Sequence, residues 1–192
     1  MELRSHILWK FVILFYAFLP LFVFVFLSLV THSKPEPSVP EVISPSIGSP
    51  VRLIIPAIDV KADIRKLGVS PKGEMEIPDN ILDVGWFKLG SLPGEKGSAV
   101  IAGHFNGENG EDGVFYNLNR LKEGDKLFVE DDKGATISFT VRESRTYDPG
   151  YAEEVYNAND SAHLNLITCD GFWDKNKKSY SKRLVVFADI EK

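Results

Sequence analysis

The feature that most constrains this chain is an apolar run over residues 11–30 that contains no charged side chain. A helix of this length spans about 30 Å, which is the thickness of the hydrocarbon core of a bilayer. A helix buried in a soluble protein is rarely apolar on every face. We therefore predict a transmembrane helix over residues 11–30, in which Pro20 is tolerated as a kink.

A cleavable signal peptide is the alternative for this run. Such peptides have an apolar stretch of about 7–15 residues followed by a small-residue cleavage site. Here the stretch is longer, and Leu29-Val30-Thr31 matches a cleavage site poorly. An uncleaved signal-anchor is favoured.

The flanks of the run predict its orientation. Arg4 and Lys10 precede the run, whereas only Lys34 follows it closely. By the positive-inside rule, we expect residues 1–10 in the cytoplasm and residues 31–192 outside the cell. The chain is thus predicted to be a single-pass protein of the cell membrane. Residues 31–50 are rich in Pro and Ser, and because Pro fixes φ they predict an extended, semi-rigid extracellular spacer.

Residues 51–192 are expected to form one mainly β domain. Short β-branched or alternating runs recur there between Gly, Pro and Asp, which indicates a barrel or sandwich. Strands are expected at 51–56, 61–69, 98–102, 126–130, 135–141, 163–168 and 184–190. Helical signal is weak and limited to 114–121 and 150–155. The net charge of −5 argues against nucleic acid as a partner.

Cys169 is the only cysteine, so no intramolecular disulfide can form. An unpaired cysteine in an exported protein indicates a reactive thiol or an intermolecular bond, although it can also be a small buried apolar residue. A strand precedes it, and Asp170-Gly171 is expected to break that strand. Cys169 is therefore predicted at a strand end, where its side chain can face a cleft.

A nucleophilic thiol needs a base or a cation beside it. Of the four histidines, His6 and His32 flank the apolar run. His163 is six residues before Cys169 on the same predicted strand, about 20 Å away. His104 remains as the candidate base, because it also follows a strand. A loop histidine bonded to backbone is the alternative for His104.

A fixed guanidinium would stabilise both a thiolate and a tetrahedral oxyanion. Arg183 is predicted to open the last strand, and strands that are neighbours in sequence often pair. It could therefore lie beside Cys169. Lys182 competes for this role but lacks the planar fork of donors. Charge and spacing alone leave open that Arg183 is a solvated surface residue.

Three segments resemble the sortases, which are cysteine transpeptidases on the outer face of mainly Gram-positive bacteria. They are Val-Ile-Ala-Gly-His ending at His104, Leu-Ile-Thr-Cys ending at Cys169, and Arg-Leu-Val-Val-Phe-Ala beginning at Arg183. The separations of 65 and 14 residues between the three functional positions suit this family. Leu-x-Thr-Cys is the most specific motif, and the resemblance covers residues 51–192.

The resemblance implies an eight-stranded sortase-type β-barrel with short helices. It implies Cys169 as the nucleophile, His104 as the general acid/base and Arg183 as the stabiliser of the substrate carbonyl and oxyanion. Secreted proteins with a C-terminal Leu-Pro-x-Thr-Gly-like sorting motif would be cleaved at the Thr carbonyl. The acyl group would pass through a thioester to a peptidoglycan amine or a pilin Lys.

The resemblance also implies residues that contact the peptide. Thr168 would support substrate binding, although it could be an ordinary strand residue. The segment 147–161 corresponds to the loop that usually holds the sorting peptide. Its Tyr151, Val155 and Tyr156 are predicted to grip the Leu and Pro of the motif, or else to pack within the loop.

Two features of the chain differ from those of some sortases, and they bear on its subclass and on its need for a cofactor. Some relatives bind calcium in the loop before the histidine strand, but residues 89–97 offer only Glu95, so no metal or other cofactor is expected. Pilin-polymerising relatives often carry an aromatic lid, and residues 33–50 contain no aromatic residue. This favours a housekeeping, class A- or D-like enzyme that anchors wall proteins, with pilin polymerisation as the alternative.

Two other function classes compete with this interpretation. An L,D-transpeptidase typically has Ser-x-Gly-Cys, whereas Ile-Thr precedes Cys169 here. A papain-like enzyme has its histidine after its cysteine, whereas His104 precedes Cys169. A non-enzymatic, membrane-tethered β module that binds a wall or protein partner would tolerate Cys169→Ala.

Overall fold

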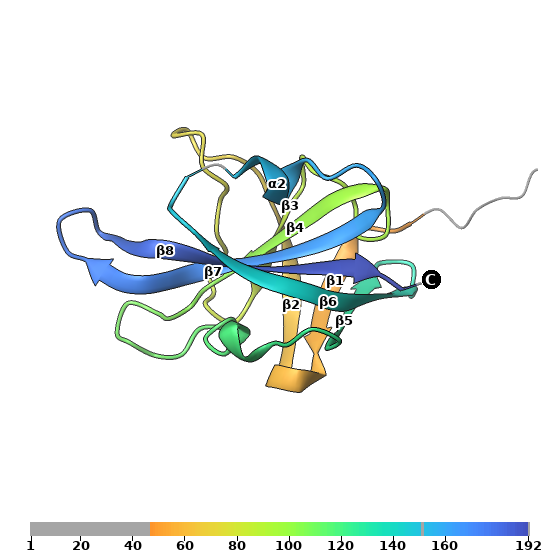
Figure 1. Ribbon diagram of the computed structural model, residues 1–192, viewed down its shortest axis with the longest axis horizontal. Coiled ribbons are helices and arrows are strands. Elements are labelled where there is room, and N and C mark those ends of the chain that lie inside the picture. The colour runs from red at the N-terminus through yellow and green to blue at the C-terminus, as the bar shows by residue number, and fades with distance from the viewer. Residues whose placement is uncertain (1–46, 151, 192) are drawn as a thin grey trace, which may run out of the picture. The chain divides into compact units, whose positions relative to one another are not determined.

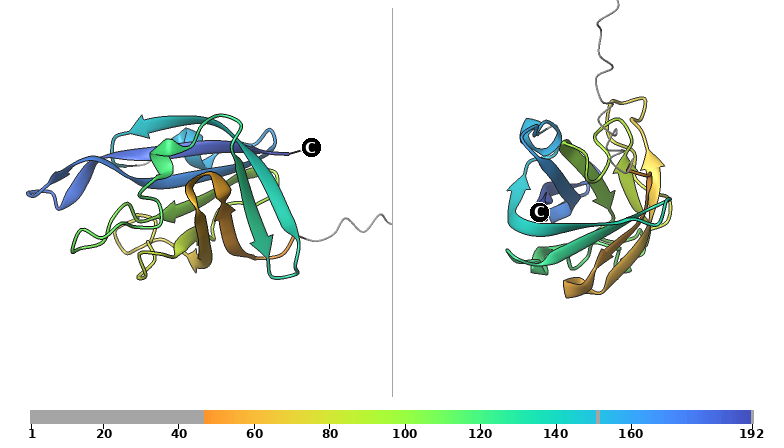
Figure 2. Two further views of the ribbon diagram at one scale, coloured as in Figure 1. Left: turned by 90° about the horizontal axis from the view of Figure 1, so that it is seen from below. Right: turned by 90° about the vertical axis from the view of Figure 1, so that its right-hand side faces the viewer.

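The computed structural model describes residues 47–150 and 152–191. The predicted membrane span and spacer residues 31–46 lie outside this part of the chain. Within it, no helix is long and apolar enough to cross a membrane. Eight strands close into a barrel in the order β1-β2-β3-β4-β7-β8-β6-β5, seen end-on in Figure 2. The mainly β, eight-stranded prediction is confirmed.

The strands are β1 (Pro50–Ile55), β2 (Val60–Leu67), β3 (Val84–Phe87), β4 (Gly97–Gly103), β5 (Lys126–Asp131), β6 (Thr136–Tyr147), β7 (Ala162–Asp174) and β8 (Ser179–Ile190). The short helices are η1 (Pro56–Ile58), η2 (Leu118–Arg120) and α2 (Glu153–Tyr156). Two of these helices, η2 and α2, fall on the two regions with weak helical signal. Strand β3 has no counterpart among the predicted strands.

Alternate residues of the strands face opposite sides of the sheet. One set fills the barrel interior, as Ile101 of β4, Leu166 of β7 and Val186 of β8 do. The neighbouring positions Val100 and Val185 face outward and pack in a second, smaller core. The outer face of β4, β7 and β8 is therefore apolar, and the connection between β6 and β7 covers part of it (Figure 1).

The predicted strand break at Asp170-Gly171 is wrong. Strand β7 continues to Asp174, and β8 begins at Ser179, so Arg183 does not open the last strand. The pairing shifts register between Asp170 and Trp173, and Gly171 takes a φ of 80°. A bulge therefore absorbs the break, because glycine adopts positive φ without strain. The resulting β7–β8 hairpin extends beyond the barrel (Figure 1).

Candidate active site

The ladders of β4, β7 and β8 set Cys169 beside Arg183 and place the end of β4, which His104 follows, on the other side of β7. Strand β4 pairs with β7 in parallel, up to the partners Ala102 and Ile167. Continuing this register by two residues sets His104, just after β4, opposite Cys169. On the other side, Cys169 is the direct antiparallel partner of Arg183.

Strand alternation also decides which face these residues share. Ile167 and Val185 pack on the outer face of the sheet. Cys169 and Arg183 are each two positions away from one of them, so they lie on that same face. The predicted pairing of Arg183 beside Cys169 thus has a direct structural basis in the register.

Cys169 is a free, half-buried cysteine. Burial raises the pKa of the Cys169 thiol, and the positive charge of Arg183 opposes this only in part. At neutral pH the thiol therefore has to lose its proton to a base as it attacks.

The imidazole of His104 is oriented by backbone. Its Nε2 atom lies 2.8 Å from the carbonyl oxygen of Pro78. A carbonyl oxygen can only accept a hydrogen bond, so Nε2 carries the proton, and in the neutral ring Nδ1 is the acceptor. The backbone bond that was expected of a loop histidine is present, and it leaves Nδ1 for proton transfer.

The guanidinium of Arg183 is held by the hairpin that carries it. Its two terminal nitrogens donate to the carbonyl oxygens of Tyr180 and Lys182 at 3.1 and 2.9 Å, and to the Ser179 hydroxyl at 3.1 Å. None of the ion pairs between described residues includes Arg183. Its charge is thus available to a substrate carbonyl or oxyanion.

The predicted competitor Lys182 has another partner. Its ammonium group lies 2.7 Å from the carboxylate of Asp148. As the immediate neighbour of Arg183 in β8, Lys182 points to the opposite face of the hairpin. The geometry therefore favours Arg183 over Lys182 beside the thiol.

Thr168 lies on the barrel side of β7. Only 3% of its surface is exposed, and its hydroxyl donates to the carbonyl oxygen of Gly103 at 2.9 Å. This bond joins β7 to β4 at the residues immediately before Cys169 and His104. Thr168 thus couples the two strand segments, and its predicted contact with substrate stays a prediction.

The residues predicted to grip the peptide lie in the connection between β6 and β7. Val155 is 1% exposed and packs with Val100 and Val185 of the sheet. Tyr156 is half-buried, with its ring 5.6 Å from that of Phe87. Tyr151 lies outside the described residues. Val155 therefore fixes α2 on the sheet, which leaves Tyr156 as the described residue with exposed surface for a peptide.

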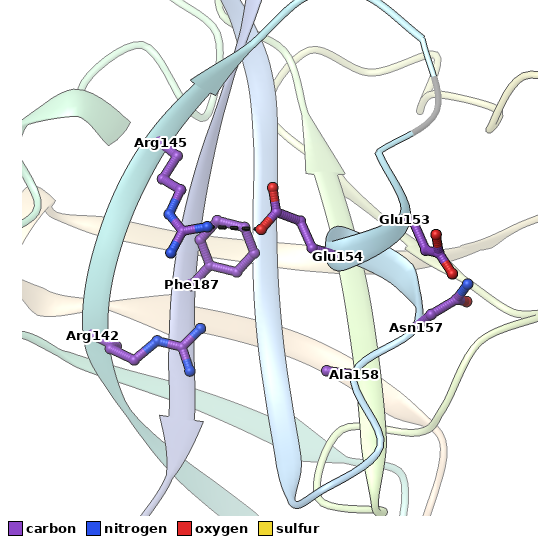
Figure 3. A pocket seen from close by; sticks show the side chains of 7 residues that line it. All are labelled: Arg142, Arg145, Glu153, Glu154, Asn157, Ala158 and Phe187. Atoms are coloured by element: carbon purple, nitrogen blue, oxygen red, sulfur yellow. Dashed lines mark hydrogen bonds and ion pairs between the residues drawn. The ribbon is translucent and has the colours of Figure 1, made fainter.

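A pocket beside α2 shows how this connection is attached. Its lining residues are Arg142, Arg145, Glu153, Glu154, Asn157, Ala158 and Phe187 (Figure 3). Glu154 accepts from Arg145 at 2.7 Å and from the Tyr147 hydroxyl at 2.6 Å. Phe187 is four residues from Arg183 along β8, about 13 Å away. Arg145, which also lines the pocket, pairs with Val185, two residues from Arg183, so the pocket lies farther along the strands that carry the site.

His163, which the sequence excluded as a partner of Cys169, has a structural environment of its own. It is 5% exposed, and its ring nitrogens lie 2.7 Å from Asp189 and 2.8 Å from Asp160. These contacts join the end of the β6–β7 connection to β8. Across residues 47–150 and 152–191, no group of three or more His, Cys, Asp or Glu could hold a metal ion.

The domain is similar to known proteins in sequence and in fold. The family model of the sortase domain matches residues 53–191. Sortase C-1 from Actinomyces oris is 26% identical, with a TM-score of 0.58 over 74% of this chain and 71% of that chain. Sortase C1 of Streptococcus agalactiae is also 26% identical, with a TM-score of 0.59 over 74% and 67%. No curated protein matches the chain.

A third relative is similar in fold only. Sortase C from Clostridium perfringens SM101 is 22% identical, with a TM-score of 0.57 over 76% of this chain and 72% of that chain. All three solved structures are sortases of type C, so they do not confirm the predicted housekeeping subclass.

Proposed function

Because the chain belongs to the sortase family of cysteine transpeptidases, we propose that it cleaves a Leu-Pro-x-Thr-Gly-like motif and transfers the Thr acyl group to a cell-wall amine. The observation that carries this proposal is the register that pairs Cys169 with Arg183 and aligns the end of β4, just before His104, with β7. These three residue types supply the nucleophile, the base and the oxyanion stabiliser of acyl transfer.

In the first half-reaction, Nδ1 of His104 accepts the thiol proton as Cys169 Sγ attacks the Thr carbonyl carbon. Arg183 stabilises the negative charge that develops on the carbonyl oxygen. The C–N bond to the following residue then breaks, His104 returns the proton to the leaving amine, and a thioester on Cys169 remains. The protonated resting thiol requires this transfer to accompany the attack.

In the second half-reaction, an acceptor amine attacks the thioester carbon and loses a proton to His104. The C–S bond breaks, and His104 returns that proton to the sulfur, so that Cys169 leaves as a thiol. The apolar run at residues 11–30 supports an anchor in the cell membrane, and its flanking charges support an extracellular catalytic domain. Substrate proteins and wall precursors would meet the enzyme there.

A second candidate differs only in the acceptor. The similar solved structures include a pilus-related sortase C of Group B Streptococcus, which is 23% identical. This supports, as the alternative, a Lys ε-amine of a pilin subunit in place of a peptidoglycan amine. The missing aromatic residues in the spacer support wall anchoring instead.

The test uses the full chain in detergent with a panel of fluorescence-quenched Leu-Pro-x-Thr-Gly peptides. Three acceptors are compared: no amine, a peptidoglycan stem peptide, and a pilin-derived Lys peptide. We expect cleavage and an amine-dependent ligation product that identifies the acceptor class. Cys169→Ala should abolish both, whereas Lys177→Ala in the exposed hairpin turn should not. Turnover by Cys169→Ala at the wild-type rate would overturn the proposal.

A further inference from the structure

His104 needs support from outside its own strand. Strand β4 ends at Gly103, so the β4 ladder does not fix the imidazole ring. The described side-chain contact of His104 is the one from Nε2 to the carbonyl oxygen of Pro78. Pro78 belongs to the connection between β2 and β3, 26 residues earlier in the chain. Whatever positions that connection also positions the ring.

The connection is held by a nearly buried carboxylate. Asp83 is 8% exposed, and its Oδ2 accepts from Nε of Arg65 at 2.7 Å. Its Oδ1 accepts from the amide of Asn80 at 3.2 Å. Backbone N–H of Asp83 donates to the Asn80 carbonyl, which closes a turn at 3.1 Å. Asp83 therefore fixes the turn that begins two residues after Pro78.

The same connection is also bonded to the segment that follows His104. The Val114 N–H donates to the carbonyl oxygen of Ile81 at 2.9 Å, and the Phe115 N–H donates to that of His104 at 2.9 Å. The β2–β3 connection thus holds the imidazole ring through Pro78. It is also bonded to Val114, whose neighbour Phe115 holds the backbone carbonyl of His104. Ion pairs of this kind add little net stability but can fix a single geometry.

We propose that Asp83, with Arg65 and Asn80, is a positioning residue for the acid/base His104. It holds the Pro78 carbonyl against Nε2, which keeps the proton on Nε2 and leaves Nδ1 as the atom that exchanges protons with Cys169 and the leaving amine. Orientation of a general base by a third group is a common requirement of nucleophile–base pairs. This role rests on the proposed transpeptidase function.

The chain offers a matched control for this proposal. Asp63 also lies beside Arg65, at 4.0 Å, but it is on β2, and 55% of its side chain is exposed. Asp63→Asn removes the same charge next to the same arginine, without touching the turn at Asn80. Arg65→Gln disturbs the Asp83 contact from the surface, and it is the second variant should Asp83→Asn fail to fold.

The first readout needs no substrate. Nitrogen-15 NMR of the full-length chain in detergent micelles, labelled in histidine, distinguishes the two ring tautomers of His104. We expect a single Nε2–H tautomer in the wild type and in Asp63→Asn. In Asp83→Asn and Arg65→Gln the two ring nitrogen shifts should move toward each other, as tautomers mix. A His104→Gln variant assigns the signals.

The second readout is peptide cleavage. Asp83→Asn and Arg65→Gln should lower kcat by roughly 10- to 100-fold, with KM within about two-fold, because a small misplacement of a catalytic group costs rate more than binding. The double variant should be no worse than either single variant. An unchanged tautomer in both variants, or an equal loss in Asp63→Asn, would overturn the proposal. The NMR result stands even if no peptide is cleaved, so the two proposals fail separately.

Discussion

The floor of the candidate site and the segment that covers it are held by different forces. The floor is built by β4, β7 and β8, whose ladders keep one register up to Asp170. Their outward residues Val100 and Val185 are 0% and 2% exposed. The cover, the connection between β6 and β7, has one buried side chain in its helix, Val155. It is further attached by exposed ion pairs, such as that of Glu154 with Arg145, and by a buried hydrogen bond from the Asn165 amide to the Val155 carbonyl oxygen.

This difference separates the chemistry from the fit to substrate. Backbone ladders and apolar packing contain no charge pairs that salt could screen, so Cys169 and Arg183 keep their register when surface charges change. Exposed ion pairs contribute about 0–1 kcal/mol each and are screened by salt. We infer that substitutions in the floor act on kcat, whereas substitutions in the cover act on KM.

The largest expected effect comes from removing the cation of the floor. Arg183→Ala should lower kcat/KM by about 10²- to 10³-fold, as loss of an oxyanion-stabilising group does, while the melting temperature stays near that of the wild type. Arg183→Lys should recover only part of the rate, since one ammonium group cannot replace the guanidinium fork. The quenched-peptide assay measures both variants.

Lys182→Gln is the matched control for this change. It removes the neighbouring positive charge on the opposite face of β8, and its partner Asp148 is exposed. A rate loss as large as that of Arg183→Ala would show that general positive charge, rather than the position beside Cys169, is what matters.

A smaller effect, on stability rather than on rate, is expected from the hydrogen bond that joins β4 and β7. Thr168→Val removes the hydroxyl that donates to the Gly103 carbonyl in a partly buried hydrogen bond. We expect a loss of about 0.5–1.5 kcal/mol in the free energy of unfolding. Urea unfolding measures this loss. Thr168→Ser, which keeps the hydroxyl, should lose clearly less. Equal stability of the Val variant and the wild type would show that the bond contributes nothing.

The pH dependence of Cys169 alkylation tests the electrostatic environment of the floor. Burial raises the pKa of Cys169, so alkylation by iodoacetamide should reach half its maximal rate at a higher pH than for an ordinary thiol. Removing the charge of Arg183 with Arg183→Gln should move this midpoint further up. A midpoint below that of a free cysteine peptide would contradict the assignment of a protonated resting thiol.

The same shift has a consequence for stability. The Cys169 thiol holds its proton more tightly in the folded protein than in the unfolded chain. Its contribution to the free energy of unfolding is therefore fully present below the pKa of the unfolded chain. It is lost as the pH rises through the folded pKa. Cys169→Ala should therefore remove part of the decrease in unfolding free energy at alkaline pH, as measured by urea titration at a series of pH values.

The smallest effect is expected in the cover. Glu154→Gln weakens the contacts of α2 with Arg145 and Tyr147, and should raise KM by about two- to three-fold with kcat unchanged. In about 0.5 M salt the difference from the wild type should shrink, because the ion pair is screened. Glu153→Gln is the control, since no ion pair between described residues includes Glu153. A change in kcat would break the division between floor and cover.

Much of the floor could be predicted from the sequence, because its signals are local. The strands around Ile101, Leu166 and Val186 are short apolar runs, and the separations of the three functional residues matched the pattern of a known family. The number of strands indicated a barrel or a sandwich, and the resemblance to the sortases implied the barrel. The pairing of Cys169 with Arg183 was foreseen from the neighbouring positions of their strands in the chain.

Other features depend on contacts that no local pattern reports. Strand β3 is four residues long and contains Gly85, where a Cβ atom would collide with the side chain of Leu67. A strand this short, with a glycine inside it, has no alternation of residue types from which it could be predicted. The strand predicted over 163–168 continues past Asp170 because β8 pairs with it beyond a bulge at Gly171.

The support of His104 was missed for a related reason. Its partner is a backbone carbonyl oxygen, that of Pro78, and any residue type supplies one. The nearby Asp83 looks in the sequence like an ordinary loop acid. Only the fold shows that it is buried and bonded to Arg65.

The central claim, that Cys169 is acylated by a sorting peptide, is tested most directly by intact-mass spectrometry. The full chain in detergent is mixed with a cleavable Leu-Pro-x-Thr-Gly peptide without amine and quenched in acid within seconds. We predict a mass increase equal to the peptide's acyl fragment, mapped to Cys169, absent in Cys169→Ala, and lost on addition of the acceptor amine. A folded, peptide-cleaving enzyme that carries its adduct elsewhere, or carries none at any time point, would contradict the account.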